Sequence, residues 1–94
     1  MTNPRVIEST AEYDIIQADY NNTVQTFRRW HSGLIEVKFN HDWAVASGYT
    51  SIADMLQKQP QIRYQINMYC GGTVPEWIAI IDGEFVIKTN IQAN

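Results

Sequence analysis

The 94-residue chain predicts a single α+β domain, residues 1–94, with a long N-terminal helix, one strand, a short helical pair and a three-strand antiparallel meander on one core. Three observations carry this prediction. Apolar residues recur every three or four positions between 10 and 31, which is typical of an amphipathic helix. They alternate with polar residues at 35–39 and 62–69, as in half-buried strands. Asp82 and Gly83 separate two further apolar runs, which is typical of a tight hairpin.

Residues 10–31 allow two interpretations. Ser9 and Glu12 have the spacing of a capping box, which favours a helix that starts here. Asn21 and Asn22 could instead turn a β-hairpin, because paired asparagines tolerate positive φ. The helix is favoured because neither flank of the asparagine pair alternates cleanly. Its apolar stripe would comprise Tyr13, Ile16, Tyr20, Val24, Phe27 and Trp30 or His31.

The stretch from Asn40 to Gln59 follows a predicted strand at Ile35–Phe39 and indicates two short helices that meet at Gly48. Asp42 is a candidate cap for the first helix, and Ser51 with Asp54 can start the second. Pro60 is expected to end that second helix, because proline restricts the residue before it.

The C-terminal third predicts three strands. Ile62 to Tyr69 alternates apolar and polar residues, and Cys70 with the two following glycines breaks the pattern. Trp77–Ile81 and Glu84–Thr89 then flank the Asp82-Gly83 turn. At the other end of the chain, Arg5–Ser9 is predicted to be an extended segment that could cover a sheet edge.

Composition excludes several classes of protein. One cysteine permits no internal disulfide, and no segment approaches the roughly 20 apolar residues that span a bilayer. The N-terminus has no apolar stretch of signal-peptide length, so a soluble, cytoplasmic protein without membrane contact is predicted. The net charge of −3 makes nucleic acid a less favoured partner than another protein.

The reactive residue types do not form a recognisable catalytic pattern. Cys70 could act as a nucleophile with His31 or His41 as its base, but a lone cysteine is more commonly a small buried hydrophobe. Two histidines ten residues apart lack the spacing of a metal site. The sequence therefore predicts no enzyme, no cofactor and no metal.

The central stretch is similar to the KilA-N-type domains of phage proteins. In those domains a strand leads through an asparagine into a small-residue helix, a glycine, and a second helix that closes in a D-x-L pattern. The matching residues cover about a fifth of this chain, with the glycine one place early, and are Val37, Asn40, Ala44, Gly48, Asp54 and Leu56.

This resemblance implies DNA binding, with the Asp82-Gly83 hairpin as a wing. The helix after Gly48 would face the DNA, although Asp54 and Gln57 stand where a helix-turn-helix unit has apolar residues. The expected contacts are Arg28, Arg29, Ser51, Gln57 and Lys58.

Aromatic residues favour a different function. Three tryptophans, five tyrosines and three phenylalanines exceed what the predicted core needs, and Tyr and Trp are common anchors of protein interfaces. We expect Trp43, Tyr49, Tyr69 and Trp30 to remain near the surface. The sequence thus predicts a small regulatory or interaction module whose partner is another protein or a second copy of the chain. A small ligand near Trp43 and Tyr49 is left open.

Overall fold

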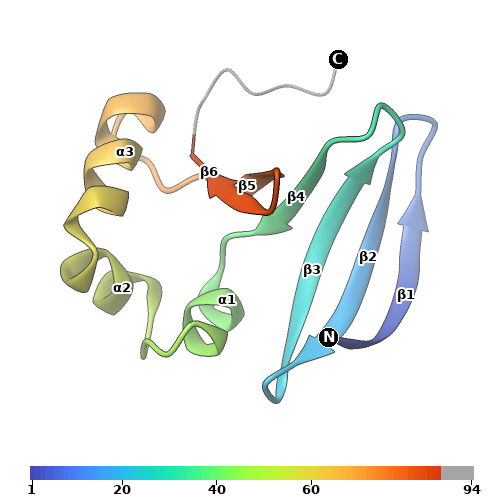
Figure 1. Cartoon of the computed structure of the whole chain (residues 1–94), viewed down its shortest axis with the longest axis horizontal. Helices are drawn as coiled ribbons and strands as arrows, with labels where there is room; N and C mark the ends of the chain where they lie inside the picture. The colour runs from blue at the N-terminus through green and yellow to red at the C-terminus, as the bar shows by residue number, and fades with distance from the viewer. Residues whose placement is uncertain (88–94) are drawn as a thin grey trace.

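The computed structural model describes residues 1–87, which form a six-stranded antiparallel sheet with three helices inserted after its fourth strand (Figure 1). Each strand pairs with its neighbours in sequence. The elements are β1 (Thr2–Ser9), β2 (Tyr13–Tyr20), β3 (Thr23–Trp30), β4 (Ile35–Lys38), α1 (His41–Ala46), α2 (Ile52–Lys58), α3 (Pro60–Cys70), β5 (Trp77–Ile81) and β6 (Glu84–Val86).

The predicted N-terminal helix is wrong, because residues 10–31 contain the β2–β3 hairpin. Asn21 and Asn22 adopt φ values of 48° and 61°, as a two-residue hairpin turn requires. Tyr20 pairs with Thr23 beside the turn, and Tyr13 pairs with Trp30 at the far end. Side chains on both faces of this hairpin are partly buried, so the strands lack the clean alternation that would have identified them.

The predicted strand at residues 62–69 is also wrong, because this segment lies in α3. Ile62 and Ile66 face the core four residues apart, whereas Tyr64 and Met68 are exposed. Pro60 occupies the first turn of α3 instead of only ending α2, a position where its missing N–H costs nothing. The expected three-strand meander is therefore the β5–β6 hairpin, paired directly with β4.

The two short helices and the last hairpin are confirmed. Asn40, and not Asp42, caps α1 by accepting a hydrogen bond from the Trp43 N–H at 3.1 Å. The predicted Ser51 cap of α2 accepts from the Asp54 N–H at 3.0 Å. At the β5–β6 turn, Asp82 has positive φ. The last two residues expected in that hairpin, 88 and 89, lie outside the described residues.

The core lies where the helices pack on β4 and β5. Figure 1 shows α1, α2 and α3 on one side of these strands and β1 and β2 on the other, while α1 contacts β3. Met55, Ile66 and Ile78 bring α2, α3 and β5 together in one buried cluster. The other buried members are Val37, Phe39, Ala44 and Ile87.

Strand β3 has two faces with different surroundings. Gln25 and Phe27 lie on the face that contacts α1, and Phe27 pairs with Val37 of β4. Arg28 and Trp30 lie on the opposite face, because successive side chains alternate along a strand. The two faces give rise to the cavity and to the arginine cluster described below.

Candidate functional site

The four aromatic residues predicted to contact a partner do not gather into one patch. Trp43 is half-buried and packs edge-on against Phe39 and Phe85, with ring centroids 5.0 and 5.2 Å apart. Tyr49 packs against the core. Trp30 lies on the opposite face of the sheet, and Tyr69 lies on α3.

Arg28 is held in a cluster of aromatic rings. Its guanidinium carbon lies 4.7 Å from the Trp77 ring centroid, 4.8 Å from that of Trp30 and 5.5 Å from that of Tyr13. Its Nε donates to Glu36 Oε1 at 2.7 Å, and Trp30 Nε1 donates to the same oxygen at 2.6 Å. Glu36 is only 7% exposed. Arg28 therefore neutralises a buried carboxylate and is not presented to a phosphate backbone.

The other residues expected to contact DNA are also separated or occupied. Arg29 pairs with Asp14 at 3.0 Å, and Lys58 pairs with Asp54 at 3.1 Å. Ser51 caps α2. Gln57 is exposed and has neither an ion pair nor a capping role among the described residues. The structure thus divides these residues between β3 and α2, and most of their polar groups bind within the chain.

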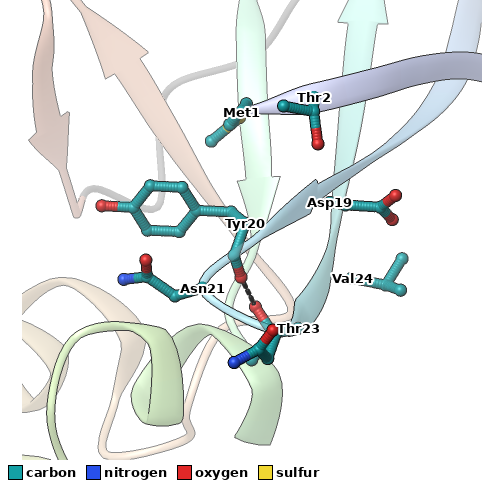
Figure 2. A pocket seen from close by; sticks show the side chains of 8 residues that line it. Met1, Thr2, Asp19, Tyr20, Asn21, Thr23 and Val24 are labelled. Carbon is teal, nitrogen blue, oxygen red and sulfur yellow. Dashed lines mark hydrogen bonds between the residues drawn. The ribbon is translucent and has the colours of Figure 1, made fainter.

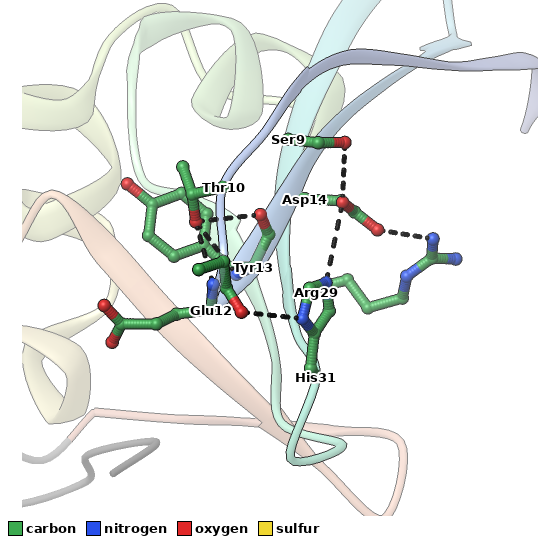
Figure 3. Close-up of polar contacts among 8 residues, drawn as sticks. Ser9, Thr10, Glu12, Tyr13, Asp14, Arg29 and His31 are labelled. Atoms are coloured by element: carbon green, nitrogen blue, oxygen red, sulfur yellow. Dashed lines mark hydrogen bonds and ion pairs between the residues drawn. The ribbon is translucent and has the colours of Figure 1, made fainter.

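Asp14 is the centre of a polar cluster at the start of β2 (Figure 3). It accepts hydrogen bonds from Ser9 Oγ at 2.8 Å and from Arg29 at 3.0 Å, and His31 Nε2 lies 3.7 Å away. The Ser9 hydrogen bond, and then the Arg29 hydrogen bond, lower the pKa of the Asp14 carboxyl below 3.8. The serine donates to the carboxylate and not to the histidine, so these groups are not arranged as a nucleophile and its base.

Replacing Asp14 with asparagine will lower the free energy of unfolding at pH 7. The gap in this free energy between the variant and the unchanged protein will become smaller in acid. A carboxyl with a lowered folded-state pKa contributes stability in full well above its unfolded value, here 3.8, and loses it as the pH falls through the folded-state pKa. Denaturant unfolding at pH 7 and below pH 3.8 measures the narrowing. Ser9→Ala should also lower the free energy of unfolding at pH 7, by a smaller amount. If the loss of stability in Asp14→Asn is the same at both pH values, the Asp14 carboxylate does not stabilise the fold as described.

Cys70 has the surroundings of a packing residue. It lies against the core cluster, and burial raises the pKa of its thiol. A raised pKa lowers the thiolate fraction, whereas a nucleophilic cysteine needs it increased. Within residues 1–87, no hydrogen bond joins Cys70 to His31 or His41. The same residues contain no group of three potential metal ligands, and none of their helices is long and apolar enough to cross a membrane.

The outer face of α3 is a candidate binding surface that the sequence prediction missed. Tyr64 is 61% exposed and Met68 is 52% exposed, one helical turn apart, with Tyr69 beside them. The opposite face of the helix is anchored by Ile66 in the core. Pro60 in the first turn of α3 was the sequence signal that could have indicated a helix here, because proline is favoured at that position.

A cavity of about 330 Å³ lies between the sheet and α1. Phe27 and Val37 line it from the sheet, Trp43 from α1 and Phe85 from β6. Gln25 also lines it and is 2% exposed. The cavity thus combines apolar walls with one buried amide.

A broader depression of about 800 Å³ lies at the β2–β3 turn (Figure 2). Its walls include Asp19, Asn21 and Thr23, and the Thr23 hydroxyl donates to the Tyr20 carbonyl oxygen across the turn. Asp19 is paired with Arg5 at 3.1 Å. The polar groups of this depression therefore hold the turn and the first strands together.

Comparison of the chain with protein-family models, with curated proteins and with solved structures finds no match. The features of the described residues that bear on function are therefore the outer face of α3, the cavity and the distribution of charge.

Proposed function

We propose that this protein is a non-enzymatic, cytoplasmic interaction module that binds a partner protein through the outer face of α3. The observation that carries the proposal is the exposure of Tyr64 and Met68 one turn apart on a helix whose other face is fixed in the core. Complete burial of one such side chain contributes about 1.5 to 3 kcal/mol. Tyrosine and methionine are also enriched in protein interfaces.

The rest of α3 indicates what kind of surface the partner offers. Its exposed polar residues are neutral amides apart from Arg63, and α3 contains no acidic residue. A helix with this face fits an apolar groove, in which residues three or four positions apart act as anchors. We therefore expect a partner groove with an acidic group at its rim, opposite Arg63. Binding there would give the module a regulatory role over the partner.

Site-directed photo-crosslinking in the native host tests this proposal. A photoreactive phenylalanine at position 64 should yield a defined protein adduct, and one at position 7 on exposed β1 should not. Adding Met68→Ser should abolish the adduct, whereas Val6→Ser should leave it unchanged. Sedimentation of the purified chain then shows whether the partner is a second copy. Absence of an adduct at position 64, or equal adducts at both positions, would refute the proposal.

Duplex DNA is the second candidate partner, and the composition of α3 favours it. The helix presents Gln61, Gln65 and Asn67 with Arg63, and amides pair with adenine edges as arginine pairs with guanine. The resemblance to KilA-N-type domains also implies DNA binding, but through α2 and not through α3. The charge distribution weighs against it, because the other five cations among residues 1–87 form ion pairs, namely Arg5, Arg28, Arg29, Lys38 and Lys58.

Titration of a random duplex at several salt concentrations separates the two candidates. If Arg63 contacts a phosphate, Arg63→Ala will weaken binding at all sequences and reduce the slope of log affinity against log salt by about one. Tyr64→Ser is the matched control on the same helix. Failure to detect binding at low salt would remove the DNA candidate and leave the protein partner.

A further inference from the structure

Two apolar features of the molecule are left uncovered by the rest of residues 1–87. One is the outer face of α3, where Tyr64 and Met68 are exposed. The other is the cavity between the sheet and α1, whose walls include Phe27 and Trp43. Residues of α3 line no part of this cavity, so the helix face and the cavity do not cover each other within one molecule.

The cavity suits the side chains that α3 exposes. Its volume of about 330 Å³ has room for one tyrosine ring and one methionine side chain. A tyrosine ring packs edge-to-face against aromatic walls such as Phe27 and Trp43, and a thioether also makes favourable contacts with them. Phe85 lines the cavity and is 54% exposed, so it marks the mouth through which these side chains can enter.

Acidic residues flank this mouth, whereas α3 carries one positive charge and no negative one. Asp42 directly precedes Trp43 of the cavity wall, and Glu84 directly precedes Phe85. Both carboxylates are exposed, and neither forms an ion pair within residues 1–87. The groove that the outer face of α3 requires, apolar with an acidic rim, is therefore present on the chain itself.

The charge of Met1 does not reverse this complementarity. Met1 is the one residue in the cavity lining that carries a charge, on its terminal ammonium. Against it stand the two carboxylates of Asp42 and Glu84, so the region around the mouth is net negative. Such a region attracts the exposed Arg63 of another molecule, and salt screens the attraction.

We propose that the partner of α3 is a second copy of the chain, whose cavity receives Tyr64 and Met68 while its acidic mouth faces Arg63. This inference rests on the proposed function, because it names the groove that the outer face of α3 enters. The helix face and the cavity are different surfaces, so the contact is heterologous. The chain therefore assembles head to tail, into a closed ring or an open filament.

Mixing two variants of the purified full chain tests the inference. The double variant Tyr64→Ser, Met68→Ser lacks the inserted side chains, and Ala46→Leu fills the cavity from its wall. In sedimentation we expect the unchanged chain to associate in a concentration-dependent way and each variant alone to be a monomer. An equimolar mixture should form a one-to-one pair and nothing larger, because one functional helix face and one open cavity remain between the two variants.

Matched controls lie on the same elements or on a distant one. Val45→Leu, on the exposed residue next to Ala46, and Val6→Ser on β1 should both assemble like the unchanged chain. If Ala46→Leu does not fold, Phe85→Ser at the mouth takes its place and should also be a monomer that pairs with the double variant.

Three results in sedimentation would overturn the inference: an unchanged chain that stays a monomer at its highest soluble concentration, assembly that survives Ala46→Leu, or a mixture of the two variants that does not pair. The photo-crosslinking experiment separates this failure from failure of the proposed function. An adduct at position 64 with a different protein would overturn the second-copy inference and leave the proposed function in place. Absence of any adduct would refute both.

Discussion

Replacing Arg28 with methionine will lower the free energy of unfolding by about 3 kcal/mol, because the change leaves Glu36 as an uncompensated buried carboxylate. Arg28 Nε is 2.7 Å from Glu36 Oε1, and Glu36 is 7% exposed. The variant also loses the contacts of the guanidinium with Trp30 and Trp77. Denaturant unfolding monitored by tryptophan fluorescence measures the loss.

Two further variants separate loss of the buried pair from loss of a surface charge. Arg29→Met removes a neighbouring, more exposed arginine paired with Asp14 and should cost less than about 1 kcal/mol. Glu36→Gln added to Arg28→Met should recover part of the stability, because the amide oxygen still accepts from Trp30 without a buried charge. If Arg28→Met costs no more than Arg29→Met, the cluster does not stabilise the sheet as described.

Replacing Met55 with alanine will cost about 3 kcal/mol, whereas the same change at Met68 will cost well under 1 kcal/mol. Met55 is 1% exposed at the contact of α2 with the core, so its removal leaves a cavity. Met68 is 52% exposed on the outer face of α3. Thermal or denaturant unfolding of the two variants provides the comparison.

This pair of methionine variants also connects stability with function. A Met68 variant that remains folded but loses its crosslinked partner separates binding from folding. Similar losses of stability at Met55 and Met68 would contradict the assignment of α3 as a helix with one face in the core and one face in solvent.

Local signals predicted part of this fold from the sequence. The Asp82-Gly83 turn and the Ser51 cap depend on residues next to each other in the chain, and the structure confirms both. Such features can be predicted from the sequence because interactions between residues close together in the chain determine them. A tight hairpin turn needs positive φ, and a helix start needs an acceptor for its free N–H groups.

The errors arose where tertiary packing decides between two patterns. Tyr13, Ile16 and Tyr20 fit a helical stripe, yet in the hairpin Tyr13 lies on one face and the other two lie on the opposite face. Ile62 and Ile66 fit both a strand alternation and a helix, because a spacing of four is a multiple of two. The sequence pattern alone does not indicate that both faces of these two strands are partly buried.

The candidate sites were less predictable than the fold. Trp43 was expected near a binding site and lines the cavity. The burial of Gln25 could not be predicted, because its hydrogen-bond partner, the Asp42 carbonyl oxygen, lies 17 residues away in sequence. A strand at residues 62–69 would place Tyr64 and Met68 on the same face as Ile62 and Ile66, so the predicted strand hides the surface that they form on α3.

Residues 13–30 form a hairpin whose two faces separately line the cavity and hold Arg28. Nuclear Overhauser effects in the unmodified protein test this most directly. We expect Hα–Hα contacts between strands at alternate register pairs, such as Ile15 with Arg28 and Gln17 with Thr26. A continuous series of contacts between each Hα and the amide three residues later would indicate a helix here and would contradict both the cavity and the arginine cluster.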